Sequence, residues 1–244
     1  MTQHDTEPQD PSGSSTRRQV LQTAAWTVPV LATAVAAPLA AASPGGCGTL
    51  NWSAAPVTVN NTRVATVSTG GSSASITIVR STIAGTPLTG SFTPLGAPPN
   101  PSIAPSGSLY MVQQTAAANA PARQRLTFTS TVPIRSVRFI VHDHTRGITY
   151  SDGVSIEGFA TRDATFLDTR PAGITRTGTG SNASPWGLSG VDTVNATGRT
   201  QITASSPTAN VSSFTFDYSN LTTPVVAGGS SMQYIALSNI EICF

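Results

Sequence analysis

The sequence predicts an all-β fold, an antiparallel β-sandwich of Greek-key or jelly-roll type. Three observations lead to this prediction. Apolar and polar residues alternate with a period of two in several segments. Clusters rich in glycine, proline and serine separate these segments, and no stretch of the predicted mature domain shows helical periodicity. Many short strands joined by turns, without helices, are typical of sandwiches.

Two segments in the first half of the predicted domain alternate as half-buried strands do. In residues 74–80, isoleucines such as Ile76 alternate with serine and threonine, and in residues 124–130 Leu126 and Phe128 alternate with arginine and threonine. We expect each segment to pack one face on a core.

Residues 135–143 predict a central strand. Val137, Phe139 and Val141 share one face, which we expect to be buried. The opposite face carries Ile140 beside polar residues, so we expect that face to be partly covered.

Two further strands are expected near the end of the chain. Residues 212–219 alternate aromatic residues with threonine and aspartate. In residues 232–244 the apolar phase shifts near Ser238 and Asn239. A β-bulge at these two residues would restore the register.

Residues 1–42 have the order of parts of a signal peptide. Arg17 and Arg18 precede an apolar, alanine-rich run that ends in small residues suited to cleavage. All 13 basic residues of the chain are arginines, and the pair at this position indicates the twin-arginine export route. The twin-arginine translocase is therefore the expected partner during export.

An uncleaved membrane anchor is the alternative for this apolar run. Pro29 and Pro38 interrupt it, and no basic cluster follows it, so we favour cleavage. We therefore expect one secreted or cell-surface domain at residues 43–244, with no stable membrane span after cleavage.

The two cysteines lie near the two ends of the predicted mature domain. In an oxidising compartment, Cys47 and Cys243 would form one disulfide closing almost the whole domain. Two unpaired buried thiols are the alternative. The disulfide requires that the first and last strands lie side by side or face each other.

Composition argues against several classes of function. Only 10% of the residues are charged, without a basic stripe or aromatic platform, so nucleic acid is not an expected partner. The serine nucleophile motif G-x-S-x-G and the zinc motif H-E-x-x-H are both absent. We therefore name no catalytic residue and expect no cofactor.

The densest polar segment is 139–159, which contains both histidines of the predicted mature domain. His142 and His144 would share a face of a strand and could bind one zinc or copper ion, with Asp152 as a third ligand. The alternative is a strand end running into a polar turn, whose side chains bond to backbone amides.

The same segment resembles a pattern in secreted actinobacterial β-sandwich proteins: Phe-x-Ile-x-Asp-x-Asp, a short hairpin loop, then Asp-x-Val. The export signal also resembles those of many secreted actinobacterial proteins. The matching residues are Phe139, Val141, Asp143, Asp152 and Val154. Thr145 stands where the pattern has its second aspartate.

The resemblance implies two facing aspartates, Asp143 and Asp152, which would suit Ca²⁺. Without a cation, the two carboxylates would repel each other unless hydrogen-bond donors neutralise them. Arg146 lies close in sequence and favours such a metal-free arrangement.

Trp186 lies in the loop segment "SPWGLSG". An exposed indole there could stack on a sugar ring, whereas a buried one would fill the core.

The leading interpretation is an exported, non-enzymatic surface or extracellular binding module whose ligand is a carbohydrate or a protein. The alternative is a secreted hydrolase, either polysaccharide-active or metal-dependent. A groove joining His142, His144 and two carboxylates would favour the enzyme.

Overall fold

The computed structural model describes residues 46–55, 61–87, 91–94, 104–114, 121–147, 150–192, 198–207, 211–221 and 232–244. The chain divides into two compact units, Met1–Ser43 and Pro44–Phe244, and every described residue belongs to the second. The predicted signal peptide, with Arg17 and Arg18, lies outside the described residues. No helix in the described part is long and apolar enough to cross a membrane.

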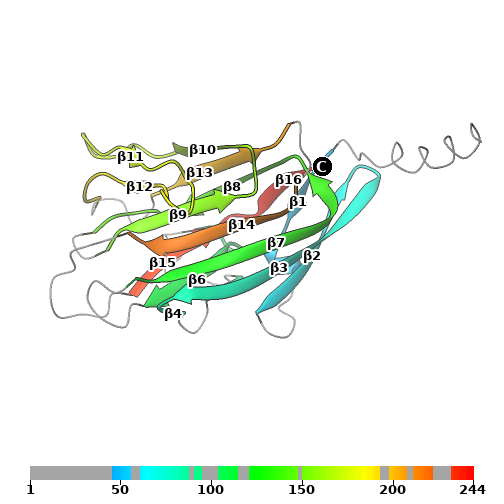
Figure 1. Ribbon diagram of the computed structural model, residues 1–244, viewed down its shortest axis with the longest axis horizontal. Coiled ribbons are helices and arrows are strands. Elements are labelled where there is room, and N and C mark those ends of the chain that lie inside the picture. Colours follow the sequence, from blue (N-terminus) through cyan, green and yellow to red (C-terminus); the bar gives the residue numbers. More distant parts are fainter. Residues whose placement is uncertain are drawn as a thin grey trace, which may run out of the picture. The chain divides into compact units, whose positions relative to one another are not determined.

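Two antiparallel sheets pack face to face (Figure 1). Sheet A has nine strands. Six of them follow one another in the order β1 (Cys47–Leu50), β16 (Ile240–Cys243), β8 (Ser136–His142), β15 (Met232–Leu237), β6 (Leu109–Gln114) and β4 (Thr86–Pro87). The other three lie off this path: β13 (Thr200–Ser205) pairs with β8 and with β10 (Thr161–Phe166), and β5 (Thr93–Pro94) pairs with β6. Sheet B has the order β2 (Thr62–Thr69), β3 (Ser72–Ala84), β7 (Arg123–Ile134), β14 (Val211–Asn220) and β9 (Asp152–Glu157).

The remaining regular elements are small. Strands β11 (Arg176–Thr177) and β12 (Gly187–Leu188) form a two-stranded sheet, and a short 3-10 turn, η1, covers Trp52–Ala54. The described residues contain no α-helix. The predicted antiparallel β-sandwich is therefore confirmed.

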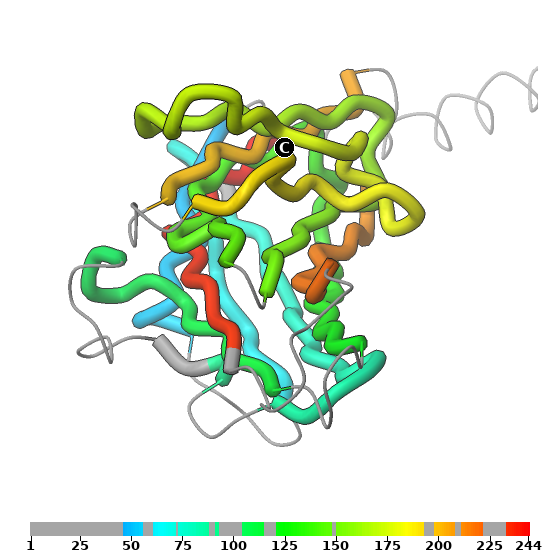
Figure 2. The backbone as a smooth tube through the Cα atoms, turned by 90° about the vertical axis from the view of Figure 1, so that its left-hand side faces the viewer, coloured from blue at the N-terminus to red at the C-terminus, as the bar shows by residue number. Residues whose placement is uncertain are grey.

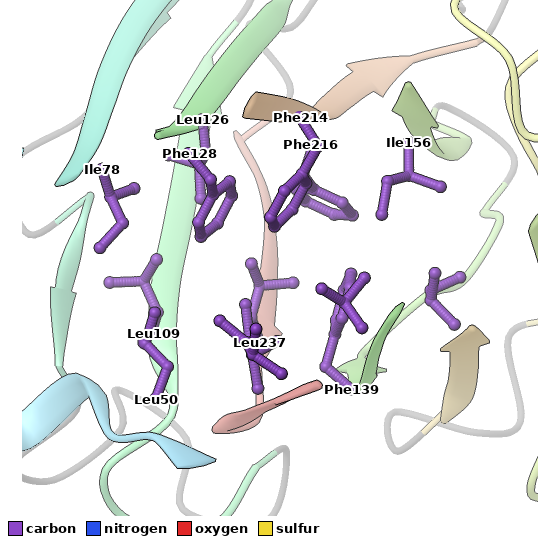
Figure 3. Close-up of a cluster of buried hydrophobic side chains, with 14 of the residues drawn as sticks. Leu50, Ile78, Leu109, Leu126, Phe128, Phe139, Ile156, Phe214, Phe216 and Leu237 are labelled. Atoms are coloured by element: carbon purple, nitrogen blue, oxygen red, sulfur yellow. The ribbon is translucent and has the colours of Figure 1, made fainter. Parts of the chain in front are cut away.

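The core lies between the two sheets and is built from the alternating residues that the sequence identifies. Leu126, Phe128 and Phe214 of sheet B face Phe139 and Leu237 of sheet A (Figure 3). The Phe128 and Phe214 rings stack with their centroids 4.3 Å apart. Burial of each such side chain contributes about 1.5–3 kcal/mol to folding.

Strand β8 is central in sheet A, as predicted. It pairs with β13 on one side and with β15 and β16 on the other. Val137, Phe139 and Val141 are buried in the core, whereas Arg138 and Ile140 lie on the outer face.

The predicted bulge separates β15 from β16. Both strands pair with β8, and the register shifts between them at Ser238 and Asn239. Ser238 N donates to Ile140 O at 2.9 Å, and Ile140 N donates to Ser238 Oγ at 2.9 Å. The indole of Trp52 donates to Ser238 O at 2.8 Å. A residue that follows β1 therefore also stabilises the bulge near the C-terminus.

The predicted disulfide is also present. Strands β1 and β16 lie side by side with Cys47 opposite Cys243, and the two sulfur atoms are bonded across a sequence separation of 196 residues. The alternative of two unpaired thiols is therefore wrong.

Candidate functional site

The predicted polar segment lies at one end of the sandwich, which faces the viewer in Figure 2. Strand β8 ends there at His142, and β9 begins there at Asp152. Antiparallel pairing brings the ends of β6 and β14 and the starts of β7 and β15 to the same end. The ends of six strands therefore lie at the end of the sandwich where β8 leads toward β9.

His142 and His144 do not share one face of a regular strand in the way that the sequence predicts. Asp143, between them, has a φ of 60°, which ends the alternation of the strand. His144 Nδ1 bonds to Thr200 Oγ1 at 3.0 Å, whereas His142 lies near Arg199. Burial lowers the pKa of each histidine to about 4, so both imidazoles are neutral at pH 7.

The expected zinc or copper arrangement is wrong for the described part of the chain. Only one group of three histidine, cysteine or acidic side chains there has its ligand atoms within 4.8 Å of one another, namely Cys47, Glu241 and Cys243. The disulfide uses two of these three. The bend at Asp143 prevents His142, His144 and Asp152 from converging.

Asp152 is held firmly inside the sandwich and is 2% exposed. Its carboxylate accepts hydrogen bonds from Thr145 N at 3.0 Å and from Tyr218 OH at 2.8 Å. Thr145, the residue that departs from the resembled pattern, also donates through Oγ1 at 3.3 Å. Burial nevertheless raises the pKa of Asp152 to about 7, because these bonds only partly offset desolvation.

Asp143 is 8% exposed, and its carboxylate makes no hydrogen bond with another described residue. Burial raises the pKa of Asp143 to about 8. The charge of nearby Asp152 raises it further, and Arg170 opposes the shift. The two aspartates are therefore a coupled, buried pair.

Arg146 does not neutralise this pair, so that expectation is wrong. Its guanidinium instead donates to the backbone oxygen of Leu188 at 2.9 Å. The cation that lowers the pKa of Asp143 is Arg170, which is itself paired with Asp192 at 2.6 Å. Arg170 is distant from Asp143 in sequence, and no local motif predicts that it lies nearby.

All four tyrosines of the chain interact electrostatically with Asp143, and Tyr218 also bonds to Asp152. The negative charge of Asp143 contributes to raising the pKa of each of them, after burial. They come from separate elements: Tyr110 from β6, Tyr150 from the connection, Tyr218 from β14 and Tyr234 from β15. Sequence reasoning missed this gathering, since only the pairing of distant strands creates it.

Trp186 belongs to the core, so an exposed stacking platform at this residue is wrong. The side chain is 2% exposed, and its backbone exchanges two hydrogen bonds with Val154 of β9. This pairing draws the loop onto the edge of sheet B. Gly180 lies against the indole ring and leaves no room for a side chain there.

A separate groove crosses the outer face of sheet A and has a volume of about 320 Å³. It spans β10, β13, β8 and β16, in that order across the sheet. Eight of its ten lining residues have polar or charged side chains: the lining consists of Ser136, Val137, Arg138, Thr161, Arg162, Asp163, Thr203, Ala204, Ser205 and Glu241. Neither the two histidines nor the aspartate pair lines it.

The groove is balanced in charge. Arg138 pairs with Glu241 at 2.9 Å across neighbouring strands, and both side chains are about half exposed. Asp163 accepts a hydrogen bond from Arg176 at 3.0 Å. The lining therefore offers charged donors and acceptors without a large net field.

Hydroxyl groups supply the rest of the polar lining. Thr161 Oγ1 and Ser205 Oγ bond to each other at 2.8 Å. Ser136 and Thr203 also line the groove and carry hydroxyl groups. A polar ligand could use both.

Comparisons with protein families, with curated proteins and with solved structures find no match to this chain. The geometry of the groove and of the buried cluster is therefore the basis for a functional proposal.

Proposed function

We propose that the protein is an exported, non-enzymatic binding module that holds neutral, hydroxyl-rich glycans in the groove on the outer face of sheet A. The observation that carries this proposal is the lining of the groove, where serine and threonine hydroxyls alternate with paired charged side chains. Carboxylate and guanidinium groups form strong hydrogen bonds to adjacent hydroxyls of a sugar.

The charge balance supports a neutral ligand over a polyanion. Arg138 and Arg162 are matched in the lining by Asp163 and Glu241. A polyanion would meet two carboxylates as well as two guanidiniums, so electrostatic attraction would be small. An apolar ligand fits poorly, because pockets for such ligands are lined mainly by hydrophobic side chains.

Binding fits the groove better than hydrolysis does. A glycosidase needs one carboxyl that stays protonated near neutral pH. Burial tends to raise the pKa of Asp163, but the hydrogen bonds from Arg176 and the backbone hold it below its ordinary value. Glu241, the second acid, is tied to Arg138.

A secreted or surface location accompanies this function. Three features support it: the twin-arginine-like order of parts in residues 1–42, the disulfide, and the resemblance of segment 139–154 to secreted actinobacterial sandwiches. The twin-arginine translocase is then the partner during export.

A glycan screen with two matched variants tests the proposal. Thr203→Arg places a bulky side chain in the groove, whereas Thr127→Arg places the same side chain on the outer face of sheet B. Both threonines are half-buried residues of central strands. We expect the full chain and Thr127→Arg to retain a neutral polysaccharide, and Thr203→Arg to lose it.

Two results would count against the proposal. One is equal retention by all three proteins. The other is capture of a protein ligand at the groove without any glycan, which would assign the surface to protein recognition.

A further inference from the structure

Two buried glutamines at the polar end of the sandwich have no partners for their side chains. Gln113 is 1% exposed and Gln233 is 3% exposed, and neither the amide oxygen nor the amide nitrogen of either one bonds to a described residue. Leaving buried polar atoms unpaired is costly, and native proteins seldom do so. Something at this end must therefore satisfy them.

The register places both glutamines between the sheets. Gln113 of β6 lies opposite Gln233 of β15. Met111 and Ile235, two residues along each strand, belong to the core, so the glutamines continue the core-facing rows. Asp143 follows β8, which is the neighbour of β15 on its other side.

Sheet B closes the same space from the opposite side. Tyr218 of β14 and Asp152 of β9 occupy core-facing positions there and bond to each other at 2.8 Å. Two carboxylates, two amide groups and a phenol from five different strands or strand ends thus lie at the same end of the sandwich.

When Asp143 and Asp152 are ionised, this end of the sandwich carries more negative charge than nearby cations cancel. Arg170 is paired with buried Asp192, and Arg199 is paired with Asp168. Neither ion pair supplies a cation bonded to Asp143 or Asp152. The aspartate pair therefore lacks a bonded counter-ion among the described residues.

We propose that this end of the sandwich interior binds a hard divalent cation of the Ca²⁺ class. Asp143 and the amide oxygens of Gln113 and Gln233 are its ligands, and Asp152 is the second carboxylate. Ca²⁺ takes six to eight oxygen ligands, including carboxylates, amide carbonyls and waters, so this donor set suits it. A divalent ion would also cancel the two carboxylate charges and give the glutamine oxygens their missing partner.

The donor chemistry distinguishes this site from a zinc site. Zinc in proteins favours histidine nitrogen and cysteine sulfur in a closed tetrahedral set. His144 uses Nδ1 for its bond to Thr200, and both cysteines are in the disulfide. Nε2 of His142 and Nε2 of His144 are buried without a partner, but among the described residues they do not join a third histidine, cysteine or acidic ligand atom within 4.8 Å.

Terbium luminescence on the full chain tests the site directly. Tb³⁺ replaces Ca²⁺ at oxygen sites, and light absorbed by Tyr218, which bonds to Asp152, is transferred to a nearby Tb³⁺. We expect tyrosine-sensitised emission that Ca²⁺ displaces, and Asp143→Asn should weaken Tb³⁺ binding by about tenfold or more. Glu157→Gln, which alters a partly exposed acid at the other end of β9 from Asp152, is the control and should leave the emission unchanged.

Thermal unfolding of Gln233→Leu provides a second readout. Leucine has a similar size but no amide, so in EDTA the variant should melt at a higher temperature than the unmodified chain. It should also gain less from added Ca²⁺, because one ligand is missing. If Gln233 served only as a structural hydrogen-bonding group, the Gln233→Leu variant would instead melt at a lower temperature than the unmodified chain.

Three results would overturn the proposal. They are the absence of sensitised emission from the unmodified chain, equal emission from Asp143→Asn, and displacement of Tb³⁺ by Zn²⁺ but not by Ca²⁺.

Discussion

Cys47 and Cys243 lie opposite each other in neighbouring antiparallel strands, and their disulfide ties the first described strand to the last. The bond closes a loop of nearly the whole domain, so it restricts the unfolded chain strongly. In the chain-entropy treatment, closing a loop of this length is worth about 5 kcal/mol.

The double variant Cys47→Ser and Cys243→Ser should therefore unfold at a much lower urea concentration. We expect its free energy of unfolding to fall by about 3–5 kcal/mol, measured by urea titration followed by fluorescence. The unmodified chain with its disulfide reduced should match the double variant. An unchanged midpoint in both would show that the disulfide does not contribute to stability.

The buried aspartates make stability depend on pH in a particular direction. The folded chain keeps protons on Asp143 and Asp152 up to pH values near 8 and 7, where the unfolded chain has released them. The free energy of unfolding therefore falls as pH rises through this range.

The buried histidines act in the opposite direction, but at lower pH. Their pKa values fall from 6.5 to about 4, so between these values the unfolded chain binds protons that the folded chain does not. Their contribution to stability then rises with pH, and below about pH 6.5 it offsets the opposite contribution of the aspartates. Only the aspartates act between pH 6.5 and 8.

In EDTA, we expect the free energy of unfolding to fall by about 1 kcal/mol for each pH unit between 6.5 and 8. Urea titrations at a series of pH values measure this slope. Asp143→Asn should flatten it, since the variant removes one titrating group and the repulsion. A slope of the opposite sign would contradict the assignment of a buried, proton-binding pair.

Gly180 and Gly173 provide a matched pair of substitutions. Both have positive φ values, 75° and 84°, that disfavour alanine. A Cβ at Gly180 would come within 2.3 Å of the Trp186 ring, whereas nothing lies within 4 Å at Gly173. Only the first substitution would therefore disturb the core.

We expect Gly173→Ala to cost about 1 kcal/mol from backbone strain alone. Gly180→Ala should cost about 1–3 kcal/mol more, because the buried indole must shift. Chemical denaturation of both variants checks the difference. Equal destabilisation would mean that Trp186 does not pack against Gly180.

The strands and their buried faces could be predicted from the sequence, because period-two alternation is a local signal. The central strand at Val137–Val141 and the bulge at Ser238 and Asn239 both follow from the phase of the apolar residues. The disulfide followed from the position of the two cysteines and their expected compartment.

The candidate sites could be predicted only in part. Asp143 and Asp152 were identified from one continuous segment, and the structure brings both into the buried cluster. Gln113, Gln233 and Tyr218 come from strands that meet only through long-range pairing. The backbone bend at Asp143, which separates the two histidines, could not be predicted from the residue types around it.

The groove on sheet A left no sequence signal either. Its lining comes from four strands that are spread over a hundred residues, and each contributes ordinary outward-facing serine, threonine or charged residues. Only the sheet order places them side by side.

Chemical-shift mapping with the glycan that the screen identifies tests the central claim most directly. Backbone amide signals of the labelled chain would be recorded while a soluble oligosaccharide of that glycan is added. We expect the largest shifts at Arg138, Asp163, Thr203 and Glu241, and small shifts across the outer face of sheet B. Shifts concentrated on sheet B, with those four residues unchanged, would contradict the assignment of the groove as the binding site.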